Sequence, residues 1–179
     1  MTADTLTIPG TFFQSGYAVY VVEIAHKPTA KRYYYLGQTG DSYHTTARPP
    51  FYRMSGHFEY GQSTQNQVFK GLCRLLNIED NDSLKKREAV ESFLVKSEIR
   101  YHVFRLHDFS YQDEEKAEHR RRRHSTLVVE TALLRRFNER YGDALLNSKL
   151  TSLKREPTET EEAQIDSVIE ELNKIGIRI

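Results

Sequence analysis

Two segments near the start of the chain, both rich in tyrosine, constrain the fold more than any other feature. Residues 17–25 read YAVYVVEIA and residues 33–37 read YYYLG, and the turn-prone sequence HKPTAK follows the first of them. Aromatic and β-branched residues favour strands, and a short polar connector favours a reversal, so these segments predict an antiparallel hairpin. Side chains alternate along a strand, so Tyr20 and Tyr35 share one face if the register matches.

Beyond the hairpin, the chain predicts helices and one further strand. Residues 64–77 and 84–96 carry apolar residues at intervals of three and four, which predicts a helical insertion at about residues 61–98. Residues 99–109, IRYHVFRLHDF, have the alternation typical of a strand. The predicted fold is therefore α+β, a small three-stranded antiparallel sheet flanked by helices.

A long helix is predicted from near Asp113 to Gly142, because acids in its first turns and a glycine at its end suit the polarity of a helix. Ser125 or Thr126 could divide it in two. Glu130 stands out on this helix, because apolar residues three, four and seven positions away surround it on one face. A carboxylate there is costly unless a cation balances it. From the helix alone, an ion pair with an arginine and a metal site are equal alternatives.

The length and the cysteine count restrict the class of protein. A chain of 179 residues suits one domain with a sizeable core. Cys73 is the single cysteine, which excludes an internal disulfide and a multi-cysteine zinc site. The first residues, MTADTLTIPG, have neither a basic start nor an apolar run, and no stretch approaches the roughly 18 apolar residues of a membrane span. We therefore expect a cytoplasmic protein with no membrane partner.

Charge is divided unevenly along the chain, although the net charge is only +1. Residues 1–155 hold 24 of the 26 lysines and arginines and 18 of the 25 acids, a net charge of +6. Residues 156–179 hold two basic and seven acidic residues, a net charge of −5. A basic body is the footprint expected of a protein that binds a phosphate backbone. The acidic segment has apolar residues at helical spacing, which predicts a C-terminal helix docked on the body in preference to a DNA-mimicking tail.

A basic pair follows the hairpin. Residues 47–57 predict a short helix after two prolines, and Arg53 and His57 are four positions apart on it. Side chains at this spacing project from one face of a helix, which allows joint contact with one phosphate. Taken alone, His57 is more typical of a surface histidine.

Together these residues resemble the GIY-YIG nucleases, a family named for two tripeptides on its opening hairpin. The matching elements, in chain order, are Ala18-Val19-Tyr20, Tyr35-Leu36-Gly37, Arg53 with His57, Glu130, and Asn147 in GDALLN. Ala18 replaces the first glycine of the family pattern, Leu36 replaces isoleucine, and the spacer between the tripeptides is longer. The resemblance covers residues 17–60 and 125–150 and is greatest to free-standing type II restriction endonucleases.

The resemblance implies a role for each of these residues. Arg53 binds the scissile phosphate, Glu130 binds Mg²⁺ or Mn²⁺, and Tyr35 positions the phosphate or a metal-bound water. Tyr20 is the general base or a water-orienting group. A free phenol titrates near pH 10, so this role requires that the metal and Arg53, with His57 as a further candidate, acidify Tyr20.

The resemblance also implies a GIY-YIG nuclease domain over residues 1–155, which contains the helical insertion, with residues 156–179 docked on the same domain. Asn147 matches the late asparagine of the family and supports the site in that interpretation. A hydrogen-bonding cap at the end of the sequence ALLN is an equal alternative.

Further basic residues are candidate contacts to the DNA backbone. They are Arg48, Arg120, Arg121, Arg122 and Arg123. Four consecutive residues cover all sides of a helix, so at most two of the last four can face one groove. A solvated face that balances Glu114, Glu115 and Glu118 is an equal alternative.

These observations predict a metal-dependent endonuclease that hydrolyses DNA phosphodiester bonds, most like a site-specific restriction endonuclease. One set of these residues holds one scissile phosphate, so a homodimer on double-stranded DNA is the economical way to cut both strands. Three alternatives stay open. They are a GIY-YIG nuclease of DNA repair or of a mobile element, a strand-transfer enzyme with a tyrosine nucleophile, and a DNA-binding module without activity.

Overall fold

A three-stranded antiparallel sheet forms the centre of the protein. The computed structural model describes residues 5–42, 44–59, 66–78, 82–112, 114–148 and 155–179. The strands are β1 (Gly16–His26), β2 (Lys31–Gln38) and β3 (Ser97–Asp108), in the order β2-β1-β3. The sheet confirms the three predicted strands, and β2 is one of its two edges.

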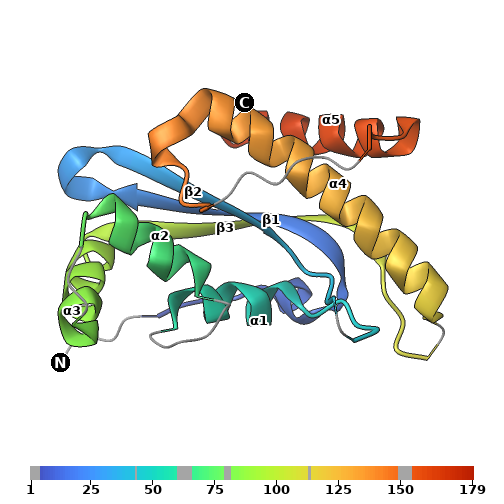
Figure 1. The fold of residues 1–179 in the computed structure, drawn as a ribbon, viewed down its shortest axis with the longest axis horizontal. Coiled ribbons are helices and arrows are strands. Elements are labelled where there is room, and N and C mark those ends of the chain that lie inside the picture. The colour runs from blue at the N-terminus through green and yellow to red at the C-terminus, as the bar shows by residue number, and fades with distance from the viewer. Residues whose placement is uncertain (1–4, 43, 60–65, 79–81, 113, 149–154) are drawn as a thin grey trace.

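Helices cover both faces of this sheet. Their bounds are α1 (Pro50–Ser55), α2 (Gln67–Leu75), α3 (Ser83–Leu94), α4 (Lys116–Tyr141) and α5 (Glu159–Lys174). Short 3-10 turns are η1 (Gly10–Phe13), η2 (Lys27–Thr29), η3 (Gly56–Phe58) and η4 (Gly142–Ala144). Figure 1 shows α1, α2 and α3 on one side of the sheet and α4 and α5 on the other. Among the described residues, no helix combines the length and the apolar character that a bilayer span requires.

The hairpin has the register that brings the two tyrosines together. Val22 pairs with Tyr35, and Tyr20 pairs with Gly37. Tyr20 and Tyr35 are therefore diagonal neighbours on one face, as predicted, and their ring centroids are 6.5 Å apart. The reversal is made by η2, after which Ala30 has the left-handed φ of 54°.

Each face of the sheet buries its own apolar core, because successive side chains of a strand point to opposite faces. The core under α4 and α5 includes Val19, Val21, Tyr34, Leu36, Val129, Leu133, Phe137, Ile165, Val168 and Leu172. The core under the other helices includes Tyr20, Val22, Ile24, Tyr35, Met54, Val68, Leu72, Val90 and Phe93. Strand β1 contributes to both cores and is buried over most of its length.

The predicted helix over residues 47–57 is wrong in its extent. The α-helix α1 ends at Ser55, with Gly56 as its C-cap, and His57 lies in the 3-10 turn η3 that follows. The spacing of a regular helix therefore does not hold between Arg53 and His57.

The long helix α4 is not divided near Ser125. The hydroxyl of Thr126 donates a hydrogen bond of 2.8 Å to the Arg122 carbonyl of its own helix, so this side chain does not disrupt the helix. Helix α4 ends at Tyr141, and the predicted glycine, Gly142, is its C-cap with a φ of 34°. The predicted start near Asp113 lies outside the described residues.

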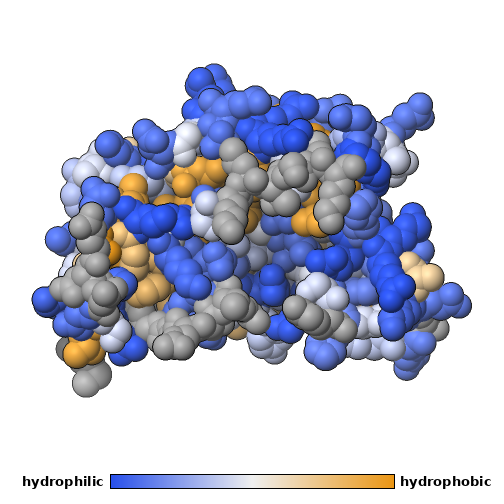
Figure 2. Space-filling model, in the orientation of Figure 1, coloured by the Kyte–Doolittle hydropathy of each residue, from blue (hydrophilic) through white to orange (hydrophobic). Residues whose placement is uncertain are grey.

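The acidic segment forms α5, which packs against α4 through the buried residues Ile165, Val168 and Leu172. Thr158 and Glu161 form a capping box, in which the Thr158 N–H donates to Glu161 Oε2 at 2.8 Å and the Glu161 N–H donates to Thr158 Oγ1 at 3.3 Å. Arg155 donates two further bonds of 2.6 Å to the Glu161 carboxylate. Hydrophilic residues predominate where the outer side of α4 and α5 is visible (Figure 2).

We expect Thr158→Ala to lower the free energy of unfolding by about 1 kcal/mol, because the first turn of α5 loses its cap. Urea unfolding followed by circular dichroism measures this loss. Thr160→Ala is the matched control, because Thr160 is an exposed residue of the same turn. Equal stability of the two variants would contradict a stabilising role of the cap.

Candidate active site

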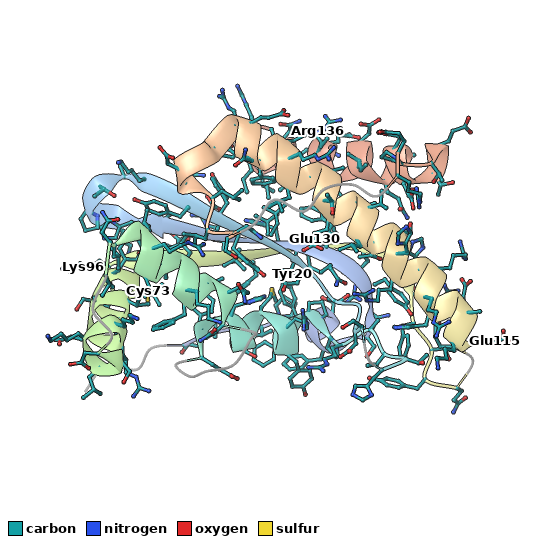
Figure 3. All side chains as sticks on the ribbon, viewed as in Figure 1. Tyr20, Cys73, Lys96, Glu115, Glu130 and Arg136 are labelled. Carbon is teal, nitrogen blue, oxygen red and sulfur yellow. The ribbon has the colours of Figure 1, made fainter. Side chains whose placement is uncertain are left out.

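The predicted site residues meet near the end of the edge strand β2. Tyr20 and Tyr35 project from the sheet face that α1 covers, and Arg53 and His57 come from α1 and the turn after it. Glu130 belongs to α4 on the opposite face, yet its charge affects both Tyr20 and Tyr35. Tyr20 and Glu130 both lie near the middle of the molecule in Figure 3. These groups therefore meet near the end of β2.

Gly37 is the residue that makes room for Tyr20. A Cβ atom at position 37 would lie 2.4 Å from the Tyr20 hydroxyl oxygen and 2.5 Å from Cζ, so no larger residue fits. The phenol thus lies across the backbone of the neighbouring strand. The glycine of the second tripeptide is required here for close approach and not for backbone flexibility.

Tyr20 and His57 form a short hydrogen bond. Tyr20 Oη and His57 Nε2 are 2.5 Å apart, and both side chains are about 98–99% buried. The rings of Tyr35 and His57 also pack closely, with centroids 4.5 Å apart. Which of the two atoms donates depends on the tautomer of His57, and in the tautomer whose Nε2 carries no proton His57 accepts from the Tyr20 hydroxyl.

Burial raises the pKa of Tyr20 well above its usual value. The neighbouring Tyr35 and Glu130 act in the same direction, whereas the guanidinium of Arg53 lowers the pKa. The pKa of Tyr35 is likewise raised, chiefly by burial and then by Glu130. The expected acidification of Tyr20 is therefore not produced by the protein groups alone, and a neutral phenol with a proton acceptor beside it describes the site.

Glu130 is a half-buried carboxylate whose pKa is affected by two guanidinium groups. Loss of hydration raises its pKa to about 7, although Arg53 and Arg123 both lower it. Among the described residues, none donates a hydrogen bond to Glu130 or lies within ion-pair distance of it. No ion pair in the described part of the chain therefore supports the alternative of a paired, structural glutamate.

The family resemblance implies a divalent metal at this site. In the part of the chain that the structure describes, no group of three or more His, Cys, Asp or Glu side chains is arranged so that it could hold a metal ion. Glu130 offers one carboxylate, which suits Mg²⁺ because that ion is commonly held by one or two carboxylates together with water and substrate phosphates. The site thus fits a metal that binds together with its substrate, and Glu130 is the residue that would hold it.

Asn147 pairs with the outer edge of β2. Its Nδ2 donates to the Leu36 carbonyl and its Oδ1 accepts from the Leu36 N–H, both at 2.9 Å. Leu146 donates its N–H to the Tyr34 carbonyl at 2.7 Å. This segment thus completes the hydrogen bonds of β2 up to the residue before Gly37. Asn147 therefore hydrogen-bonds to the strand that carries Tyr35 and Gly37.

The candidate DNA contacts fall into two groups. Three of them form ion pairs within the chain. Arg48 lies 2.6 Å from Asp41, Arg121 lies 2.6 Å from Glu118, and Arg122 lies 2.5 Å from Glu118. Arg122 also pairs with Glu114 at 3.1 Å. This favours the solvated-face interpretation for Arg121 and Arg122. Arg120 is exposed, and Arg123 faces Glu130.

A second buried polar group lies at the start of α4, and the sequence analysis did not predict it. Tyr17 donates a hydrogen bond of 2.6 Å to Glu114, and its oxygen lies 2.6 Å from His119 Nδ1. Nε2 of His119 lies 3.1 Å from the Asp41 carbonyl. This group links β1, α4 and the loop after β2. Its residues are separated by up to 102 positions, so no local motif contains them.

In comparisons of this chain with known proteins, no protein-family model, curated protein or solved structure matches it.

The raised pKa of Glu130 predicts that this residue destabilises the fold at alkaline pH. A carboxyl whose pKa is about 7 when folded and about 4.5 when unfolded holds its proton more tightly in the folded state. Stability is therefore lost as the pH rises from about 4.5 to 7. We expect Glu130→Gln to raise the free energy of unfolding at pH 8 by on the order of 1–3 kcal/mol.

Urea unfolding at pH 8 and pH 5 measures this effect, and the gain should be smaller at pH 5. Glu139→Gln is the matched control, because Glu139 is exposed on the same helix. A variant at position 130 that is no more stable than the wild type at pH 8 would show that the carboxylate is well satisfied.

Proposed function

We propose that the protein is a metal-dependent endonuclease that hydrolyses DNA phosphodiester bonds and has the GIY-YIG type of fold. One observation carries this proposal. A tyrosine with a bonded histidine, a guanidinium and a half-buried carboxylate converge from four separate segments. Hydrolysis of a phosphodiester requires a proton acceptor for water, positive charge for the phosphoryl oxygens, and help for the leaving oxygen.

The proton path follows from the Tyr20 and His57 bond. Tyr20 passes its own proton to His57 Nε2 and accepts the proton of the attacking water on Oη. The water oxygen forms the new bond to phosphorus, and the bond to the leaving oxygen breaks. The leaving oxygen then takes a proton from solvent. A high pKa suits Tyr20 for this relay, because a strong base is formed only while the proton is moving.

Arg53 and Glu130 would balance the negative charge of the phosphate, Arg53 directly and Glu130 through a bound cation. The Nε atom of Arg53 is buried and makes no hydrogen bond to any described residue, so it is available to a phosphoryl oxygen. A divalent cation on Glu130, when bound, would neutralise charge on the phosphate and on the leaving oxygen. Tyr35 packs against His57 and holds the ring of the proton acceptor in place.

The burial of Tyr20 favours hydrolysis over the tyrosine-nucleophile alternative. Its side chain is 1% exposed and lies against the backbone of Gly37. A phenol that attacks phosphorus must reach a bulky phosphodiester, whereas the relay needs only a water molecule. The inactive binding module is disfavoured by Glu130, since a carboxylate beside a phosphate weakens binding and its burial costs stability.

We expect Tyr20→Phe to slow the cleavage of supercoiled plasmid DNA in Mg²⁺ about a hundredfold or more, because the proton relay is lost. Glu130→Gln should abolish cleavage while DNA binding stays nearly intact. Tyr34→Phe is the matched control, because Tyr34 is a buried tyrosine of β2 on the opposite face. Gel electrophoresis of the plasmid measures the rates.

Other outcomes have distinct meanings. Near-normal cleavage by Tyr20→Phe would refute the relay, and an active Glu130→Gln would refute the role of the carboxylate. Cleavage that resists a chelator and leaves protein covalently attached to DNA would favour a tyrosine nucleophile. A wild-type protein that binds plasmid but never cuts it would support the binding module.

We further propose that this nuclease acts as a restriction endonuclease, as a homodimer that cuts both strands of a symmetric duplex site. This finer proposal is supported only by the family resemblance and by the presence of a single set of site residues. We expect analytical ultracentrifugation with a cleavable duplex to show two chains per DNA. A single bound chain that nicks one strand, or that prefers branched DNA, would instead support a repair or mobile-element role.

A further inference from the structure

Arg123 differs from its three arginine neighbours in what surrounds it. Arg121 and Arg122 are held by acids on the outer side of α4, and Arg120 is exposed. Arg123 is half-buried and lies against Gly40, where its Cγ would be 2.9 Å from a Cβ atom. It is seven positions before Glu130, two helical turns away, so both side chains leave α4 on the same side.

The turn after β2 leaves room for the Arg123 side chain at Gly40. Gln38 accepts a hydrogen bond of 2.5 Å from the Gly40 N–H and donates one of 3.1 Å to the Gly40 carbonyl. These two bonds fix the residue that Arg123 packs against. Any larger residue at position 40 would displace the arginine. The position of Arg123 is therefore specified from two elements, the end of β2 and the helix.

Two guanidinium groups act on one carboxylate at this site. Arg53 and Arg123 both lower the pKa of Glu130. The Nε atoms of both arginines are buried and have no hydrogen-bond partner among the described residues. A buried donor without an acceptor costs free energy, and an unbalanced cation adds to that cost. An anion with several acceptor oxygens would satisfy both.

We propose that Arg123 is a second phosphate-binding residue, which together with Arg53 grips the DNA backbone near the end of β2. This inference rests on the proposed nuclease function for the identity of the ligand as DNA. The guanidinium fork suits phosphate oxygens, and its charge does not depend on pH in the working range. Arg53 approaches from α1 and Arg123 from α4, so the backbone is held from both faces of the sheet. This grip does not require a metal ion.

The first test measures the affinity for a 30-bp duplex in EDTA over a series of salt concentrations. We expect Arg123→Gln to weaken binding at low salt by about tenfold, the size of one charge-assisted hydrogen bond. The slope of log K against log salt should fall by about 1, since one phosphate contact is lost. Arg121→Gln is the matched control, because it removes the same charge from the same helix but from a guanidinium that Glu118 already holds. Equal effects of the two variants would overturn the inference.

The second test separates this inference from the proposed function. Proton–nitrogen NMR spectra of the arginine Nε groups are recorded in EDTA, with and without inorganic phosphate, and Arg53→Lys and Arg123→Lys identify the signals. We expect both signals to shift with phosphate. Shifts in a protein that never cleaves DNA would support the anion site while refuting the nuclease. Cleavage by a protein whose Arg123 signal does not move with phosphate or duplex would refute the grip and leave the nuclease in place.

Discussion

The close approach of the Tyr20 phenol to the backbone of Gly37 determines how the rest of the site is arranged. It exists only in one register of the β1–β2 hairpin, because a shift by one residue would turn Tyr20 to the other face. Once the phenol lies across β2, its hydroxyl reaches the edge of the sheet, where His57 meets it. The edge strand is thus both the support for the tyrosine and the border around which the charged residues gather.

The site keeps several unfavourable contacts that a purely structural core would avoid. Tyr20 is a buried phenol with a raised pKa, and Glu130 is a carboxylate whose pKa is raised to about 7. Two guanidinium Nε atoms are buried and have no hydrogen-bond partner within the described ranges. The sheet and its two apolar cores must supply the stability that holds these groups in place. Clusters of perturbed ionisable groups are typical of functional sites.

The sequence predicted those parts of the fold and site that depend on local periodicity. Alternation placed Tyr20 and Tyr35 on one face, and helical spacing identified Glu130 as a carboxylate on an apolar face. The break in the helix before His57 was not predicted, because helical spacing says little about where a short helix ends. Arg123 could not be separated from its neighbours, because four consecutive arginines look alike until packing fixes the rotation of the helix. The close contact between Gly37 and the Tyr20 phenol joins two strands, so no local sequence pattern contains both residues.

The acidic C-terminal helix α5 affects the site indirectly, because its packing helps to fix the rotation of α4 about its axis. Helix α4 packs against α5 and against β1 and β2, and its buried residues Val129, Leu133 and Phe137 share one core with these elements. Turning α4 about its axis would remove these side chains from that core. The same turn would carry Glu130 away from the edge of β2, together with the arginine two turns before it. The apolar contacts of α4 with α5 and with the sheet therefore set the direction in which Glu130 and Arg123 point, although α5 contributes no charged residue to the site.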